Sequence, residues 1–597
     1  MLRVADYIMQ KLHDSGVNHV FQVTGRGSLF LSDALAKNKN LTAVSLHHEQ
    51  SCSFAAVGYA EQTDGLGVAL VSTGCASTNT LTGVLTAWQD GIPCVFISGQ
   101  NVLKETTNYT NIGIRTFGQQ EADIVKLVKH ITKFAIMLTK PEDIVQIMDD
   151  AINAAISGRK GPVWIDVPID LQSSLIDPVL SIEPTMETNS IFPESKLDDL
   201  NLVVNLLNVS ERPLILIGKG VRFSGADDEL FKLVEQTRIP VTFSASAVDI
   251  FGTGSSNLSI GSVGAMGCSR AGNFAVANSD LLLVLGSRLN SLTTGPDYCD
   301  FARGAKVVVV DIDPVEHQKD SVKKDHFINL DLKLFLSELN KFKINSTSEV
   351  WINKCLHWKQ LFSSIEEPFK SNSVIDLYQL SDTLSNKLPH NSTLVVDSGL
   401  AEVILPSNIR FRKGMRCIHP TSQGAMGFAV PASIGVQLAK KGFVLVVVGD
   451  GSIMMNLQEM ESIRYHKLPI KIIVVNNNVY SIIRKRQQDL FRTRTIGTDP
   501  ENGISVPDFK KVADCFGLKY LKIENIGSLN DGIDELFSME GSVLCELMGN
   551  HNQSYIEIGT IRSSENGKIV RRPLEDQFPF IDRELFMSEM IIRPIKQ

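Results

Sequence analysis

The sequence lacks the patterns that would place it in several large protein classes. Its nine cysteines are scattered along 597 residues, with no CxxC pair and no metal-ligand spacing, so neither a disulfide scaffold nor a zinc module is predicted. No apolar run approaches the roughly 18 to 20 residues that a membrane-spanning helix needs. Lys and Arg (58) are outnumbered by Asp and Glu (66) without long runs of either sign, which argues against a nucleic-acid partner. No GxGxxG motif lies on a first strand–turn–helix unit, which disfavours a dinucleotide-dependent dehydrogenase.

The patterns that are present predict a well-cored α/β protein. Hydrophobic residues make up 43% of the chain and charged residues 21%, as in ordinary globular proteins. Short apolar runs bounded by Gly, Asn or Asp alternate with longer helical patterns, which is typical of parallel sheets covered by helices on both faces. The scattered cysteines favour a reducing compartment, and the segment Met1–Asp6 does not resemble a signal peptide. We therefore expect a cytoplasmic protein with no membrane partner.

The chain divides into three consecutive doubly wound parallel-sheet domains and a tail. We expect the domains at residues 1–176, 192–341 and 372–548, with a linker rich in Pro, Ser and Glu at 177–195. In the third domain the expected strands are Leu394–Val396, Val444–Val448 and Ile472–Val475, with a helix over Met455–Tyr465. The tail, 549–597, contains three prolines and is interpreted as a lid or a packing arm.

The strongest motif pair follows two strands of the third domain. Gly449-Asp450-Gly451-Ser452 comes directly after one apolar strand, and Asn476-Asn477-Asn478 comes directly after the next. Each motif alone is most simply an ordinary turn. Because ligands of open α/β sheets bind at the carboxyl ends of the strands, however, the pair predicts a shared site for Mg²⁺, which prefers carboxylate and carbonyl oxygens, beside a diphosphate.

This pair resembles the signature of the thiamine-diphosphate enzymes, in which GDG is followed after a similar gap by NN. The resemblance implies that Asp450, Asn477 and the main-chain oxygen of Val479 bind Mg²⁺. It also implies cofactor contacts from several neighbouring residues, namely Gly449, Gly451, Ser452, Asn477 and Tyr480.

Glu49 is the second candidate of this resemblance. It follows an expected strand at Ala43–Leu46, where a lone Glu is ordinarily a solvated helix-capping residue. In the thiamine-diphosphate enzymes a glutamate at this place hydrogen-bonds the aminopyrimidine ring of the cofactor and enables removal of the thiazolium C2 proton, so the resemblance implies that Glu49 transfers protons. His48 is a further catalytic candidate that could equally be structural.

The resemblance is closest to the acetolactate synthase branch and extends to about residue 550. Ser72 to Asn79, including Gly74, resembles a segment of that branch, although Cys75 stands where a proline is usual. Gly424 to Phe428 resembles the segment whose methionine holds the cofactor in a bent shape, which makes Gly424 and Met426 cofactor-binding candidates, although Met426 could also be core filler. Gln120 and Glu121 resemble a pair near the active site of that branch, and Gln120 is a candidate for substrate contact.

The central domain both resembles and departs from the flavin-binding pattern. Three segments resemble those that surround FAD in acetolactate synthases: Ile260 to Gly267, Leu285 to Arg288 and Asp311 to Asp313. After Arg288 that branch usually has two acids, where this chain has Asn290 and Ser291. FAD is therefore left open as a cofactor of the central domain.

A group of basic residues follows the asparagines: Arg484, Lys485, Arg486, Arg492 and Arg494. These residues are interpreted either as a solvated helix face or as a site that steers an anionic acceptor, such as a phosphorylated or nucleotide-linked sugar.

The sequence thus predicts a decarboxylase and carboligase dependent on thiamine diphosphate and Mg²⁺, with pyruvate as the default donor and a second carbonyl compound as acceptor. In the family Glu49 and Asp450 would complete one site from two subunits, which implies a homodimer or homotetramer. The alternatives are a carboligase for a sugar acceptor, a C–C hydrolase or simple decarboxylase, and a non-catalytic nucleotide-binding homologue. Retention of Glu49, Asp450 and Asn477 argues against the last.

Overall fold

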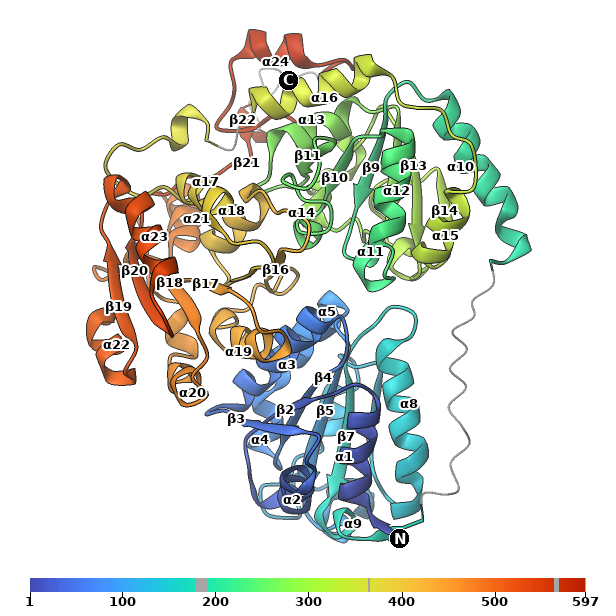
Figure 1. Cartoon of the computed structure of the whole chain (residues 1–597), viewed down its shortest axis with the longest axis vertical. Helices are drawn as coiled ribbons and strands as arrows, with labels where there is room; N and C mark the ends of the chain where they lie inside the picture. Colours follow the sequence, from blue (N-terminus) through green and yellow to red (C-terminus); the bar gives the residue numbers. More distant parts are fainter. Residues whose placement is uncertain (178–191, 363–364, 563–568, 596–597) are drawn as a thin grey trace.

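The structure is a computed structural model that describes residues 1–177, 192–362, 365–562 and 569–595 (Figure 1). Three six-stranded sheets succeed one another along the chain, and every strand pair within them is parallel. Helices lie between the strands and cover both faces of the sheets. The prediction of an α/β protein built from three doubly wound parallel sheets is therefore confirmed.

The first sheet has the strand order β3-β2-β4-β5-β7-β6. Its strands are β2 (His19–Gln22), β3 (Thr42–Ser45), β4 (Gly67–Val71), β5 (Cys94–Gln100), β6 (Phe134–Met137) and β7 (Val163–Pro168). The helices around it are α1 (Val4–Asp14), α2 (Leu29–Lys37), α3 (Glu49–Thr63), α4 (Cys75–Asn79), α5 (Leu81–Asp90), α6 (Thr107–Thr110), α7 (Ile124–Val128), α8 (Ile144–Ile156) and α9 (Ile169–Gln172). A short antiparallel pair, β1 (Leu2–Arg3) with β8 (Leu175–Ile176), joins the beginning and end of this unit.

The second sheet has the order β11-β10-β9-β12-β13-β14. Its strands are β9 (Pro213–Ile217), β10 (Val241–Phe243), β11 (Ser259–Ser262), β12 (Leu281–Leu285), β13 (Lys306–Asp311) and β14 (His326–Asn329). The accompanying helices are α10 (Leu197–Val209), α11 (Gly220–Phe223), α12 (Asp227–Thr237), α13 (Arg270–Asn278), α14 (Ser291–Thr294) and α15 (Leu332–Leu339), followed by α16 (Glu349–Leu361).

The third sheet has the order β16-β15-β17-β18-β20-β19. Its strands are β15 (Thr393–Val396), β16 (Arg416–Ile418), β17 (Val444–Gly449), β18 (Ile470–Asn476), β19 (Lys519–Ile523) and β20 (Val543–Met548). The helices are α17 (Leu377–Lys387), α18 (Leu400–Asn408), α19 (Ala429–Ala439), α20 (Glu459–Tyr465), α21 (Ser481–Phe491), α22 (Phe509–Phe516) and α23 (Leu529–Ser538). The apolar runs of β17 and β18 are buried, as expected for central strands covered on both faces.

The strand orders locate the places where ligands can bind. Counted from its own first strand, each of the outer sheets has the order 2-1-3-4-6-5, whereas the central sheet has the dinucleotide-binding order 3-2-1-4-5-6. In the third sheet the order reverses between β15 and β17, so the loop after β17, which begins at Asp450, lies at the switch point. In the central sheet it reverses between β9 and β12. Ligands of such sheets bind outside the carboxyl ends of the strands at these points.

One expected element differs from the structure. The helix predicted over Met455–Tyr465 is wrong in its first half, because a short 3-10 turn at Ile453–Met455 is separated from α20 by Asn456 to Gln458. The side chain of Asn456 hydrogen-bonds Gly427 and Gln50, which holds its backbone outside helical geometry (φ −137°).

The tail packs against the central domain. It contains two antiparallel pairs, β21 (Glu557–Ile558) with β24 (Gln577–Phe578) and β22 (Thr560–Arg562) with β23 (Ile569–Arg571), and a helix, α24 (Arg583–Glu589). Figure 1 shows α24 beside α16 and α13. Most of the predicted linker, 178–191, lies outside the described residues. Among those that are described, no helix is both long enough and apolar enough to cross a membrane.

Candidate functional site

Asp450 lies at the centre of the candidate site, directly after β17. Its side chain is buried, with 3% of the residue exposed. The carboxylate accepts hydrogen bonds from three main-chain N–H groups, those of Gly451 (2.7 Å), Asn477 (3.1 Å) and Asn478 (2.6 Å). Burial raises the pKa of this carboxyl to about 6, because the charged form loses solvation that the N–H groups only partly replace. A cation placed here would stabilise the carboxylate.

The segment after β18 supplies the other predicted metal ligands. The Asn477 side-chain amide donates to the Ser481 hydroxyl (2.8 Å), and its oxygen accepts from the main-chain N–H of Val479 (3.2 Å). Asp450, Val479 and Tyr480 line one cavity, of about 160 Å³. The ring of Tyr480 packs on Gly451, where a Cβ would lie 1.8 Å from the ring, so only glycine fits.

A buried acid that the motif analysis missed organises the adjacent glycines. Asp397 follows β15 and accepts hydrogen bonds from the Ser452 hydroxyl (2.5 Å) and from the main-chain N–H groups of Gly427 (3.0 Å) and Ala429 (2.7 Å). It therefore spans the switch point between β15 and β17. Its position directly after an apolar strand was a signal that could have identified it.

Met426 projects from the segment that Asp397 holds. Gly424 and Gly427 flank it with positive φ values of 61° and 79°, and Met426 itself is half-buried. The carbonyl of Gly427 accepts a hydrogen bond from Asn456 (2.9 Å). The Met426 side chain is thus partly accessible at the surface of the domain.

Glu49 begins helix α3 in the first domain and is half-buried. Its carboxylate accepts a hydrogen bond from the side-chain amide of Asn79 (2.9 Å), at the end of α4. His48 is the N-cap of α3, because its Nδ1 accepts from the main-chain N–H of Gln50 (3.2 Å). The structure thus gives His48 a capping role, whereas the carboxylate of Glu49 has one side-chain partner. Asn79 is a further residue that the motif analysis did not single out.

Gln120 lies against Gly74. A Cβ at Gly74, which has φ +66°, would lie 1.8 Å from the carbonyl oxygen of Gln120. Gln120 is exposed, whereas its neighbour Glu121 is buried and accepts hydrogen bonds from Thr107, at the start of α6, and from Phe117. Gln120 is therefore available to a ligand, and Glu121 has a structural role.

Within one chain the structure forms two separate groups of candidate residues. In the described part of the molecule Glu49 hydrogen-bonds Asn79 and none of the residues around Asp450. The two domains are nevertheless joined nearby, because the Asn456 side chain donates to Gln50 (3.1 Å) and accepts from Ser51 (3.0 Å), the residues that follow Glu49. The sequence pattern predicts a helix through Asn456, so it gives no sign of this linking role.

The donor set around Asp450 fits a hard cation. It consists of one buried carboxylate, one amide oxygen and one main-chain carbonyl, the oxygen ligands that Mg²⁺ prefers when a diphosphate and water complete its shell. Across the described residues, no group of three His, Cys, Asp or Glu side chains is placed to hold a metal.

A second cavity lies at the switch point of the central sheet. It is lined by the loops after β9, β12 and β13 and by residues 158–160 of the first domain. Gly218 and Gly286 approach so closely there that a Cβ on Gly218 would lie 2.3 Å from the Gly286 oxygen. The segment Ile260–Gly267, which was expected near FAD, does not line this cavity and packs on the tail, where the Gly267 N–H donates to the Ile556 carbonyl (2.7 Å).

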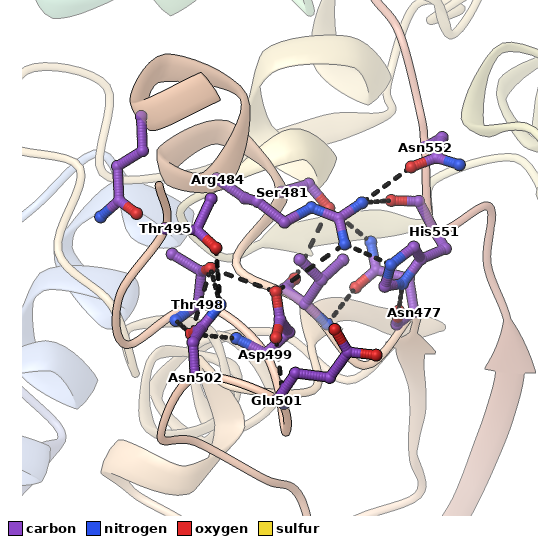
Figure 2. A network of polar contacts seen from close by, with 12 residues as sticks. Asn477, Ser481, Arg484, Thr495, Thr498, Asp499, Glu501, Asn502, His551 and Asn552 are labelled. Atoms are coloured by element: carbon purple, nitrogen blue, oxygen red, sulfur yellow. Dashed lines mark hydrogen bonds and ion pairs between the residues drawn. The ribbon is translucent and has the colours of Figure 1, made fainter. Parts of the chain in front are cut away.

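The basic residues of α21 make contacts with the tail. Lys485 and Arg486 both pair with the buried Glu557 of the tail (2.7 and 3.1 Å). Arg484 hydrogen-bonds His551 and Asn552 (Figure 2). Lys485 and Arg484 are thus engaged inside the molecule, whereas the Arg486 side chain stays 48% exposed. The interpretation of the basic group as a steering site for an anionic acceptor stays a prediction.

Comparisons with known proteins agree with this arrangement. Three models of thiamine pyrophosphate enzymes match in order: the N-terminal TPP binding domain at residues 2–127, the central domain at 200–339 and the C-terminal TPP binding domain at 397–547. The chain is 31% identical over 551 residues to an acetolactate synthase large subunit of Porphyra purpurea, covering 90% of each chain. It is 28% identical over 584 residues to that of Haemophilus influenzae, covering 96% of this chain and 99% of the relative. The tobacco (Nicotiana tabacum) acetolactate synthase 1 is 30% identical over 567 residues, which is 92% of this chain and 82% of the relative.

Proposed function

Because the chain belongs to the thiamine pyrophosphate enzyme family, we propose that it decarboxylates pyruvate or a similar 2-oxo acid and joins the remaining two-carbon unit to a second carbonyl compound, as in acetolactate formation. The relatives named acetolactate synthase cover nearly the whole chain, which favours this reaction over hydrolysis of a C–C bond, transfer to a sugar or a non-catalytic role. The partners are then small molecules: a 2-oxo acid as donor and a carbonyl compound as acceptor.

The cofactor would be thiamine diphosphate with Mg²⁺. We assign the ion to Asp450, Asn477 and the carbonyl of Val479, and the diphosphate to the N–H groups around Gly449, Gly451 and Ser452. Tyr480 and Gly424 would line the cofactor, and Met426 would support its bend. When bound, thiamine supplies an electron sink for the carbanion equivalent left by decarboxylation.

The chain's own residues would transfer protons and bind the substrate. The Glu49 carboxylate, held by Asn79, would exchange a proton with the pyrimidine ring, and its half-buried position keeps it reachable from a neighbouring site. Gln120, exposed beside Gly74, would contact the substrate carbonyl. His48 would act through α3, which it caps, and not on the substrate directly.

The domain roles follow from these assignments. Residues 1–176 would bind the pyrimidine end, 372–548 the diphosphate and metal, and 549–597 would brace the central domain, 192–341. We place a flavin nucleotide, if the protein carries one, in the central cavity between Gly218 and Gly286. Its lining includes four cations and five acids: Arg159, Lys160, Lys219 and Arg288, with Asp90, Asp311, Asp313, Glu316 and Asp331. Release of a yellow chromophore on denaturation of the purified protein tests this, and a colourless preparation that takes up no added FAD contradicts it.

A complete site would require two copies of the chain. Glu49 and Asp450 share no hydrogen bond within one chain, and both domains carry exposed apolar side chains, including Phe117 and Ile114 in the first domain and Met454 and Met455 in the third. We therefore propose a homodimer or a homotetramer. Sedimentation of the purified protein at micromolar concentration should show it, and a fully active monomer would exclude it.

The buried carboxylate of Asp450 is the observation that carries the proposal. Calorimetric titration of thiamine diphosphate into the protein should show binding that depends on Mg²⁺ and is lost on chelation. Asp450→Ala should abolish that binding, because the ion would lack its anionic protein ligand. Equal affinity in wild type and variant would refute the metal assignment.

A further inference from the structure

Arg484 joins the candidate metal site to the beginning of the tail (Figure 2). It lies in the first turn of α21, one turn beyond the segment Asn477–Val479. One guanidinium nitrogen donates to Nε2 of His551. The other donates to the His551 carbonyl (3.1 Å) and to the Asn552 side chain (2.7 Å). Three hydrogen bonds from one side chain fix the turn that follows β20.

These contacts determine the tautomer of His551. A guanidinium has only donors, so Nε2 of His551 must accept and the ring proton must lie on Nδ1. Nδ1 is 3.0 Å from the main-chain oxygen of Asn477 and therefore donates to it. Arg484 thus acts on Asn477 through an oriented imidazole, in the way that outer partners orient metal-ligating groups.

The segment Asn477–Val479 is held from two sides as a result. On the inner side, the Asp450 carboxylate accepts the N–H groups of Asn477 and Asn478. On the outer side, His551 donates to the Asn477 oxygen. Rotation of the Asn477 peptide would break the hydrogen bonds to Asp450 and to His551. The direction of the Asn477 amide and of the Val479 carbonyl therefore depends on both of these contacts.

On its other side, the Arg484 side chain faces a turn that is held by hydrogen bonds. Its guanidinium is 3.9 Å from the Asp499 carboxylate, in a turn that the Asn502 side chain ties together by bonds to Thr498, Asp499 and Thr495. Thr498 in turn accepts the main-chain N–H of Tyr480 (2.8 Å). Asp499 balances the charge of Arg484, so the arginine has no free charge to offer a substrate.

We propose that Arg484 and His551 are positioning residues of the metal site: they hold the main chain of Asn477 so that Asn477 and Val479 present their oxygens to the ion. The inference rests on the proposed function. It makes the first residues of the tail part of the site, and it gives Arg484 a role in metal affinity, not in recognition of the acceptor.

The test measures the Mg²⁺ concentration that half-saturates binding of thiamine diphosphate, by calorimetry or protein fluorescence, without reference to turnover. Arg484→Met and His551→Leu should each raise it about tenfold, as is usual when an outer partner of a metal ligand is lost. His551→Asn should stay within about threefold of wild type, because an amide can both donate to Asn477 and accept from Arg484. Arg464→Met, which removes an exposed cation of α20 in the same domain, is the control and should leave the value unchanged.

A second readout separates positioning from general loss of stability. Hydrogen exchange of the amides of residues 477–480 should be faster in the cofactor-free Arg484 and His551 variants, whereas exchange in the strands β15 and β17 should not change. At saturating Mg²⁺ the turnover number should recover to within about threefold of wild type, since the ligands themselves are intact.

The outcomes are distinguishable. If the wild type binds the cofactor and the Arg484 and His551 variants need no more Mg²⁺ than it does, the positioning role is wrong and the proposed function stands. If Arg464→Met has the same effect as Arg484→Met, the effect is one of overall charge and the inference fails. If the wild type shows no Mg²⁺-dependent binding, both the function and the inference are overturned. If Arg484→Met does not fold, the Mg²⁺ requirements of His551→Leu and His551→Asn are compared instead, and their difference tests the same positioning role.

Discussion

At the scale of single residues, the chemistry depends on carboxylates held in different surroundings. Asp450 and Asp397 are buried and surrounded by N–H groups, whereas Glu49 is half-buried and has one amide partner. Asp450, Asn477 and Glu49 could be picked out from the sequence because they follow apolar strands within a known spacing. Asp397 carries the same signal, since it directly follows the strand β15, but its hydrogen-bond partners depend on the fold. Asn79 and His551 could not be picked out, because each acts through a fold-dependent contact with a residue distant in sequence.

The first prediction concerns Glu49. Glu49→Gln should leave the affinity for thiamine diphosphate and Mg²⁺ within about threefold of wild type, because a Gln oxygen can still accept from Asn79. Exchange of the cofactor's C2 hydrogen should slow by at least about a hundredfold, since an amide cannot pass a proton to the pyrimidine ring. NMR of the cofactor in D₂O measures this, and exchange at the wild-type rate would remove Glu49 from the mechanism.

The second prediction concerns Asp166, a fully buried acid of β7 that accepts from Ser98 (2.6 Å) and Gln100 (3.1 Å). Burial raises its pKa from 3.8 to about 7. Between these values the folded state keeps a proton that the unfolded state has lost, so this group lowers the free energy of unfolding as pH rises, by up to about 1.4 kcal/mol per pH unit.

Asp166→Asn removes that ionisation. The difference in unfolding free energy between variant and wild type should therefore shift in favour of the variant from pH 4 to about pH 7 and level off above it. Urea denaturation at a series of pH values gives this difference. A difference that stays constant with pH would show that Asp166 titrates normally.

At the scale of elements, helices α3 and α19 connect the two outer domains, and Figure 1 shows them where these domains meet. A Cβ on Gly58 of α3 would lie 2.3 Å from the Ala432 oxygen, and one on Gly435 of α19 would lie 1.9 Å from the Ala55 oxygen. The pairing of α3 with α19 could not be predicted from the sequence, because contact between distant helices leaves no periodic signal. Since α3 begins at Glu49 and α19 follows Met426, this contact sets the position of both.

The third prediction tests that contact. Gly435→Ala should destabilise the protein by about 3 kcal/mol, because the new methyl group collides with main chain that cannot move aside. Gly442→Ala is the matched control: its nearest neighbour is an oxygen at 3.7 Å, so the change should be neutral or slightly stabilising. Thermal unfolding compares the two, and equal melting temperatures would contradict the close packing.

At the scale of the whole molecule, the tail joins parts that the domain pattern treats as separate. Glu557 pairs with α21 of the third domain, and the neighbouring Ile556 accepts a hydrogen bond from Gly267 of the central domain. Farther along, the Glu589 carboxylate accepts from Lys354 (2.6 Å), Trp358 (2.9 Å) and His357 (3.0 Å) of α16. The three sheets were predictable because each has its own apolar strands. The path of the tail was not, since its short pairs depend on contacts with domains already formed.

The fourth prediction follows from these anchors. Glu589→Ala should leave a lysine, a histidine and a buried indole N–H without their acceptor, at a cost of about 2 to 3 kcal/mol to docking of α24. Limited proteolysis should then cleave near α24 before any of the three sheets is attacked. Cleavage at the wild-type rate would mean that packing of Phe586 against Phe274, and not the carboxylate, holds the helix.

The central claim, that this chain is a thiamine-diphosphate enzyme acting on pyruvate, is tested most directly by following [2-13C]pyruvate by NMR with the purified protein, thiamine diphosphate and Mg²⁺. Two molecules of pyruvate and one proton should give one acetolactate and one CO₂, with both labelled carbons retained in the product. Conversion should stop when the cofactor or the ion is omitted, and should fall at least about a hundredfold in Glu49→Gln. Pyruvate that persists unchanged with cofactor demonstrably bound, or conversion that survives in Glu49→Gln at the wild-type rate, would contradict the account.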